Sequence, residues 1–232
     1  MKYKLSDVKT MYLGRTLYRV KALRSFQVNG KWPVTEGELG GWVEHTDNLS
    51  QNGTCWVGGN ARVYGGGRVT EDAHVFGESH VYDVAHIADR AIVCDKASVF
   101  QHAQVYEDAQ VVGDARVYGI AEIHGKAKVI DRARCYQRAW VYGDVVVNGN
   151  ANITEKTTLD PVVIQGLRYT VTIMDEHISF DCESATIKEW VDMTTKEIIS
   201  MDGKEAAVFD KKYRPMILAM LQTLRPQSMG NV

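Results

Sequence analysis

Basic and aromatic residues stand two positions apart at several places in the chain. The pairs are Arg62/Tyr64, His80/Tyr82, Arg116/Tyr118 and Arg134/Tyr136. Side chains two positions apart on a strand share a face, so each pair would present a cation beside a ring. A guanidinium can bind phosphate through two hydrogen bonds, and an aromatic ring can stack on a base. We therefore predict that these eight residues bind an anionic, nucleotide-like molecule.

The same residues have a second interpretation. Counting Phe100, five aromatic rings recur at one constant interval, from Tyr64 to Tyr136. A ladder of such rings would stabilise the strands that carry it, by about 0.2–1 kcal/mol for each neighbouring pair. The residue types alone leave both interpretations open.

These residues belong to a six-residue repeat that runs from Cys55 to Asp160 without an insertion. The first position is small, as at Ala61, and the third is aliphatic from Val57 to Leu159, except at Cys135. This period excludes an amphipathic helix, and on a strand it places the first and third positions in a core. The second and fourth positions face outward, and turn-prone residues follow them. Eighteen units predict six triangular coils, each made of three units.

Each coil has three outer faces, and every third unit of the repeat falls on the same face. Face 1 carries the four pairs above, together with Ser98/Phe100 and Asn152/Thr154. Face 2 carries Arg68/Thr70, His86/Ala88, Gln104/Tyr106, Glu122/His124 and Trp140/Tyr142. Face 3 carries Trp56/Gly58, His74/Phe76, Ile92/Cys94, Gln110/Val112, Lys128/Ile130 and Val146/Asn148.

Face 3 is too apolar to be left in water, and an exposed patch of this kind usually marks an interface. We therefore expect self-association around a threefold axis. The residues predicted in this interface are Phe76, Ile92, Val112, Ile130 and Val146.

The repeat resembles the left-handed parallel β-helix of hexapeptide-repeat proteins. Upstream of it, Gly40-Gly41-Trp42-Val43, Asp47-Asn48-Leu49-Ser50-Gln51 and Cys55-Trp56-Val57 resemble the first segment of bacterial and phage β-helix proteins often labelled acyltransferases. The resemblance implies a left-handed coil and a homotrimer with clefts between its subunits. It also suggests a phage-encoded protein in a bacterial host.

Acyl transfer needs a general base, usually histidine, and a cleft for an acyl thioester. Enzymes that this chain resembles place that histidine by a projecting loop, and the repeat has none. His74, His80 and His86 fall on three different faces, so only His102 and His124 remain candidates, across a subunit interface. The zinc carbonic anhydrases of this fold need three convergent histidines, and the expected close pair is absent.

The segments on either side of the repeat differ from it in composition. Residues 1–31 contain eight Lys/Arg and one acid, whereas residues 32–54 contain four acids and no Lys or Arg. The basic stretch could meet an anion or nucleic acid; we favour its pairing with the acidic stretch. We expect an N-terminal cap at 1–54, the β-helix at 55–160 and a C-terminal α+β module at 161–232.

Local patterns predict the elements of both end segments. In the cap we expect a strand over Thr16–Phe26. In the C-terminal module we expect a hairpin over residues 169–180 with its turn at Asp175-Glu176. A short helix should follow over Ser184–Met193, and a second over Lys204–Leu224, interrupted at Pro215.

Composition limits the function further. The 232 residues are 45% hydrophobic and 24% charged, and the net charge of −2 argues against duplex DNA as a partner. No run approaches the length of a membrane span, and Met1–Leu5 lacks the apolar stretch of a secretory signal. Cys55, Cys94, Cys135 and Cys182 have no CxxC spacing, so we expect reduced thiols in the cytoplasm.

We therefore expect a mainly β, homotrimeric binding protein without a cofactor or metal, and we lean against catalysis. It would sequester an anionic, nucleotide-like signal in clefts between subunits, or bind a host protein, to counter host defence. The alternative is an acyl-CoA-dependent acyltransferase of the hexapeptide-repeat class.

Overall fold

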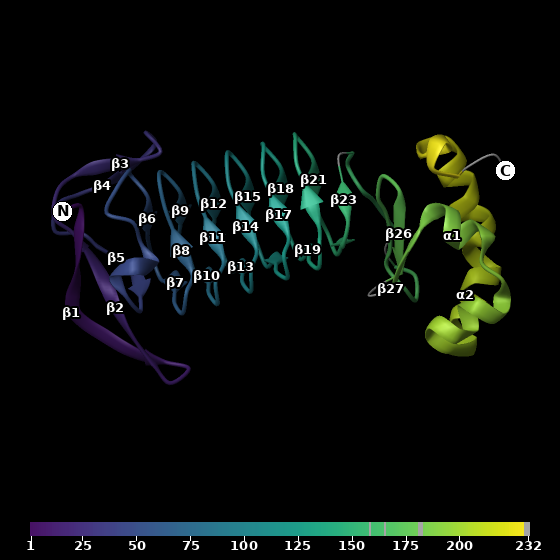
Figure 1. Ribbon diagram of the computed structural model, residues 1–232, viewed down its shortest axis with the longest axis horizontal. Helices are drawn as coiled ribbons and strands as arrows, with labels where there is room; N and C mark the ends of the chain where they lie inside the picture. Colours follow the sequence, from purple (N-terminus) through teal and green to yellow (C-terminus); the bar gives the residue numbers. More distant parts are fainter. Residues whose placement is uncertain (158, 165, 181–182, 230–232) are drawn as a thin grey trace. The chain divides into compact units, whose positions relative to one another are not determined.

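The computed structural model describes residues 1–157, 159–164, 166–180 and 183–229. The chain divides into two compact units, Met1–Thr158 and Leu159–Val232. The first unit is a parallel β-solenoid with additional N-terminal strands, and the second combines a four-stranded sheet with helices (Figure 1). The predicted fold class, mainly β with a parallel solenoid of about six coils, is confirmed.

Three parallel sheets run along the solenoid, one for each predicted face. Their strands are very short and pair in register with the strands one coil before and after, so that His80 lies between Arg62 and Ser98. Face 1 contains β7 (Arg62–Val63), β10 (His80–Val81), β13 (Ser98–Val99), β16 (Arg116–Val117), β19 (Arg134–Cys135) and β22 (Asn152–Ile153). Face 2 contains β8 (Arg68–Val69), β11 (His86–Ile87), β14 (Gln104–Val105), β17 (Glu122–Ile123) and β20 (Trp140–Val141). Face 3 contains β6 (Trp56–Val57), β9 (His74–Val75), β12 (Ile92–Val93), β15 (Gln110–Val111), β18 (Lys128–Val129) and β21 (Val146–Val147).

The solenoid core contains the first and third positions of the repeat, as predicted. Along one coil, Ala85, Ile87, Ala91 and Val93 are all fully buried. The aliphatic side chains fill the centre of the triangle, and the small first residue fits beside the corner. This burial explains why the repeat allows almost no polar residue at these two positions.

The corners of the coils need an unusual backbone conformation. All sixteen fifth positions from Gly59 to Gly149 have a positive φ, between 52° and 81°. Half of them are glycine, which adopts this conformation without a steric penalty. The others are Asp, Glu or Gln, and several of their side chains accept a hydrogen bond from a backbone N–H one coil later. Glu107, for example, accepts from Gly125 at 2.7 Å, and Gln101 from Gly119 at 2.7 Å.

The solenoid begins upstream of the repeat. β5 (Leu39–Val43) pairs in parallel with β7, with Val43 opposite Val63, and Leu49 forms a bridge with Val69. The partners in both pairs are two positions further apart in the sequence than those of the later coils, because two extra residues lie between Leu49 and Val57. This irregularity hides the first coil from a search for six-residue steps.

At its other end, the last predicted unit of the repeat is wrong. β23 (Lys156–Thr157) pairs with β20, and Lys156 lies opposite Trp140, two positions earlier than the repeat requires. Thr157 is fully buried, whereas Leu159, predicted to be in the core, is 47% exposed. The last corner is therefore two residues shorter than the others, and Thr157 takes the place in the core that Leu159 was expected to fill.

Two N-terminal hairpins complete the first unit. β1 (Tyr3–Tyr12) and β2 (Arg15–Ala22) are antiparallel and extend the sheet of face 1 through β5. The second hairpin consists of β3 (Phe26–Val28) and β4 (Trp32–Val34), and a short 3-10 helix, η1 (Thr46–Asn48), follows β5. The strand predicted up to Phe26 therefore ends at Ala22. One basic residue of the cap pairs as we favoured, because Arg15 and Glu44 form an ion pair at 2.9 Å.

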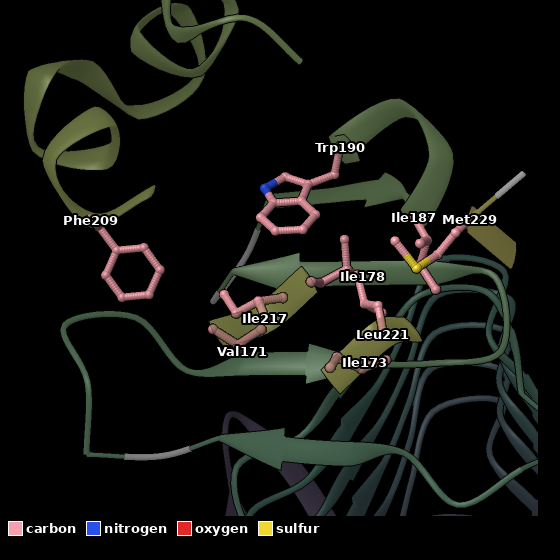
Figure 2. Close-up of a cluster of buried hydrophobic side chains, with 9 residues drawn as sticks. All are labelled: Val171, Ile173, Ile178, Ile187, Trp190, Phe209, Ile217, Leu221 and Met229. Atoms are coloured by element: carbon pink, nitrogen blue, oxygen red, sulfur yellow. The ribbon is translucent and has the colours of Figure 1, made fainter. Parts of the chain in front are cut away.

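In the residues that the structure describes, the C-terminal unit has one antiparallel sheet and two α-helices. Its strands are β24 (Val162–Ile164), β25 (Val171–Ile173), β26 (His177–Phe180) and β27 (Glu183–Thr186). The helices are α1 (Ile187–Asp192), α2 (Thr195–Leu224) and the 3-10 helix η2 (Pro226–Met229). β25 and β26 form the predicted hairpin. A cluster of nine buried apolar residues joins the sheet to the helices, with Phe209 at one end and Met229 at the other (Figure 2).

The predicted start of the first helix in this unit is wrong, and so is the predicted interruption at Pro215. Residues 183–186 are a strand, and α1 begins at Ile187 because Thr186 and Glu189 form a reciprocal capping box. α2 begins at Thr195, after a second capping box of Thr194 and Glu197. α2 consists of two helical segments that meet at a kink at Asp202–Gly203, where Gly203 has a φ of 75°. The second segment matches the helix predicted over Lys204–Leu224, although its backbone stays helical at Pro215, whereas the segment before the kink was not predicted. Among the described residues, no helix is long and apolar enough to cross a membrane.

Candidate functional site

The predicted aromatic residues of face 1 form one continuous stack. Tyr64, Tyr82, Phe100, Tyr118 and Tyr136 lie nearly parallel, with successive ring centroids 4.9–5.1 Å apart and interplanar angles of 1–7°. The faces of neighbouring rings cover each other. A ligand that approaches the ladder between its ends therefore meets ring edges, which cannot stack on a base.

On the first coils, face 1 is covered by the N-terminal hairpin of β1 and β2. Tyr12, at the end of β1, packs against Tyr64 and His80 with centroids 5.7 and 5.6 Å apart. The Arg62 guanidinium lies 4.8 Å from the centre of the Tyr12 ring. Burial lowers the pKa of His80, and the nearby Arg62 lowers it further. The predicted binding residues Arg62, Tyr64 and His80 are thus part of a packed contact with the N-terminal hairpin.

On its later coils, face 1 is exposed and strongly basic. Arg116 and Arg134 occupy adjacent rungs, and both are exposed. They line a cleft of about 290 Å³, which we call the basic cleft. Its lining residues are Lys96, Ser98, Asp114, Arg116, Arg132 and Arg134. Four cations against one carboxylate give the basic cleft a net charge of +3, in a chain whose net charge is −2.

Two columns of side chains build the basic cleft. Ser98, Arg116 and Arg134 come from the second repeat position on three successive coils, while Lys96, Asp114 and Arg132 come from the sixth position, at the preceding corner. Strand spacing sets successive rungs about 4.8 Å apart. Among the salt bridges of the described residues, none involves any of the four cations. The sequence analysis missed the column of Lys96, Asp114 and Arg132 because it considered only the second and fourth positions of the repeat. These three residues recur with the same period of three units.

The apolar side chains of face 3 lie in two different environments. On the first coils, the β3–β4 hairpin covers the face: Phe26 packs on Trp56, and Trp32 lies 5.0 Å from His74 and 6.4 Å from Phe76. On the later coils, which this hairpin does not reach, face 3 carries a strip of partly exposed apolar residues. We call Ile92, Val112, Ile130 and Val146 the apolar strip; with Phe76, they are the predicted interface residues.

The two histidines considered for catalysis lie in different environments. His124 stacks on Tyr106 at 4.8 Å, and the Trp140 indole N–H donates a hydrogen bond to its Nε2 at 2.5 Å. Its Nδ1 lies 3.7 Å from Glu107. His102 is exposed in an open groove of about 780 Å³, at the corner between faces 1 and 2, which we call the corner groove. Of these two histidines, only His102 therefore offers an accessible imidazole.

The described residues contain no cluster of three or more His, Cys, Asp or Glu side chains that could hold a metal ion. Cys55, Cys94 and Cys135 are buried free thiols, as predicted, and Cys182 lies outside the described residues. Asp175 and Glu176 form the turn between β25 and β26, where the Met174 N–H donates to the His177 carbonyl at 2.8 Å.

Comparison with models of known protein families finds no match, and comparison with curated protein sequences finds none either.

Proposed function

We propose that this chain is a non-catalytic binding protein that assembles as a homotrimer and holds a phosphate-bearing, nucleotide-like molecule at the basic cleft. The observation that carries the proposal is the cleft itself: four exposed cations on three coils, without salt-bridge partners among the described residues. Guanidinium groups suit phosphate because their planar donors match two of its oxygens. Two arginines on adjacent rungs would hold phosphates of one ligand.

The position of the basic cleft supports binding between subunits. Lys96, Asp114 and Arg132 stand at the corner between face 3 and face 1. If the apolar strip of face 3 packs against a neighbouring copy, that neighbour comes to lie beside this corner. A trimer of this kind would have three equivalent basic clefts. The resemblance to phage β-helix proteins supports a host nucleotide signal as the ligand, with sequestration as the role.

The test is native mass spectrometry and calorimetry of the full chain with ADP, inorganic diphosphate and acetyl-CoA. We expect a trimer that binds up to three molecules of ADP.

Replacing Arg116 and Arg134 by alanine should weaken this binding at least about tenfold for each residue, because each substitution removes a charge-assisted hydrogen bond to the ligand. Arg138→Ala removes the same charge at the opposite corner, in the corner groove, and should leave affinity unchanged. Equal losses in Arg138→Ala and the cleft variants would contradict the assignment, and a trimer without ligand would redirect the search to protein partners.

The alternative proposal is acyl transfer with His102 as the base, supported by its exposed position in the corner groove. Binding of acetyl-CoA, together with turnover that His102→Ala abolishes, would favour this alternative. Binding of acetyl-CoA that depends on Arg116 and Arg134 but occurs without turnover would keep the first proposal.

A further inference from the structure

A separate pocket lies within the C-terminal unit. It occupies the space between the sheet, α1 and the first turns of α2, has a volume of about 50 Å³ and is lined mainly by apolar groups. A volume of this size holds about four water-sized groups. We call it the aromatic pocket; its lining includes Tyr169, Phe180, Trp190, Phe209, Asp202 and Asp210.

Phe209 contacts two of the other rings of the aromatic pocket at steep angles. Tyr169 and Phe180 both meet Phe209 nearly at right angles, with centroids 5.0 and 6.1 Å apart. Phe180 lies 5.7 Å from Trp190. Trp190 and Phe209 also belong to the buried cluster, so packing holds these two rings in place (Figure 2). All four rings line the pocket, so a cation inside it would have aromatic groups on several sides.

Carboxylates lie beside these rings. The break in α2 at Asp202–Gly203 takes Asp202 out of the helix, and a hydrogen bond between Asp202 and the Tyr169 hydroxyl raises the Tyr169 pKa. Asp210 binds Arg214 through Oδ2 at 2.8 Å. Its Oδ1 is buried and, within the described part of the chain, has no hydrogen-bond partner.

Two arginines already lie close to rings of this cluster. The Arg214 guanidinium lies 4.7 Å from the centre of the Trp190 ring, and Arg168 lies 5.8 Å from that of Tyr169. Each of these arginines also pairs with an acid, Asp210 and Glu205 respectively. Glu183 and Asp202 therefore give the pocket lining an excess of negative charge.

We propose that the aromatic pocket binds a small methylated ammonium ion. Its methyl groups pack against Phe180, Trp190 and Phe209, and Asp202 balances its charge at the rim. A trimethylammonium group has four non-hydrogen atoms, which suits the volume. A methylated cation fits better than a bare one because the apolar lining cannot replace the hydration shell of a primary ammonium group. A wholly apolar ligand would make no electrostatic interaction with the carboxylates of Glu183 and Asp202.

The test compares three ligands by calorimetry and NMR titration of the full chain. Choline carries the methylated cation, 3,3-dimethylbutan-1-ol is its neutral analogue of the same shape, and ethanolamine is the cation without methyl groups. We expect choline to bind with a dissociation constant of about millimolar and the other two about tenfold more weakly. Equal affinity for choline and the neutral alcohol would show a purely apolar pocket, and no binding of choline would also overturn the proposal.

Variants place the site and separate binding from folding. Asp202→Asn keeps a hydrogen-bond acceptor for Tyr169 and should weaken choline about fivefold without changing the affinity for the alcohol. Tyr169→Leu should weaken choline as well. Val208→Ala, at a 65% exposed position of α2 outside the lining, is the matched control and should bind as the wild type does. Circular dichroism checks that each variant is folded; a folded Asp202→Asn with unchanged choline affinity would refute the assigned role of this carboxylate.

Discussion

Burial of His74 should make the stability of the solenoid unit depend on pH. Its side chain is only 7% exposed, and its ring lies 5.0 Å from Trp32 and 4.4 Å from Phe76. Within the described residues its Nδ1 has no hydrogen-bond partner. Burial lowers the His74 pKa from 6.5 to about 4. The folded chain therefore holds the neutral ring.

The sign and size of the effect follow from this shift. Between pH 6.5 and about 4, the unfolded chain binds a proton at His74 that the folded chain does not bind. The free energy of unfolding therefore falls as the pH falls through this window, and it is unaffected by His74 above it. At about 1.4 kcal/mol for each pH unit, the loss at the bottom of the window is about 3 kcal/mol.

Urea unfolding of the wild type and of His74→Phe, at about pH 7.5 and about pH 4.5, measures this loss. Phenylalanine keeps a ring between Trp32 and Phe76 but cannot be protonated. We expect the wild type to lose about 2.5 kcal/mol more than the variant between the two pH values. Glu44 and Asp108, whose pKa values are lowered by hydrogen bonds and neighbouring arginines, add acid sensitivity to both proteins, so only the difference is informative.

A control variant identifies the source of the effect. His102→Phe replaces an exposed histidine of the same solenoid and leaves His74 in place, so it should keep the acid-induced loss of stability that the buried ring causes. Parallel stability curves for the wild type and His74→Phe would refute the reasoning, since the buried ring would then contribute nothing to the pH dependence.

Two further predictions concern the solenoid. Val112→Lys combined with Ile130→Lys places two charges in the apolar strip and should give monomers or aggregates in native mass spectrometry; an unchanged trimer would exclude this strip from the interface. Gly53→Ala should lower stability by about 3 kcal/mol in chemical unfolding, because its Cβ would collide with the Glu71 carbonyl group. Gly14→Ala, also at a positive φ but with nothing within 4 Å, should cost only about 1 kcal/mol, and equal losses would contradict the steric explanation.

Sequence reasoning succeeded where one physical constraint repeats. Every coil must bury an aliphatic residue and turn at the same place, so the three-unit period gave the register of all three faces. It failed where the period changes, as at the two extra residues before Val57 and the short corner before Thr157. Those changes depend on how the ends of the solenoid are closed, and no local pattern expresses them.

The candidate site was predictable only in part. Arg116 and Arg134 were predicted to bind the ligand, each paired with a tyrosine two positions later, because both occupy an outward strand position. The packing of Tyr12 on Tyr64 and of Trp32 on His74 was not, because each joins residues far apart in the sequence through hairpins outside the repeat. The aromatic pocket was missed for the same reason, since its rings come from the loop before β25, from β26 and from two helices.

The three-strand coil also restricts how such a chain can change its length. Removing one six-residue unit between Phe100 and Arg116 would rotate every downstream column to the neighbouring face, separating Tyr118 from Phe100 and Arg116 from Ser98. Removing or duplicating three consecutive units would preserve every column and only shorten or lengthen the prism. Natural length variants of this solenoid should therefore differ by whole coils, and a duplicated coil inserted after Arg134 would extend the basic cleft to recognise a longer polyanion.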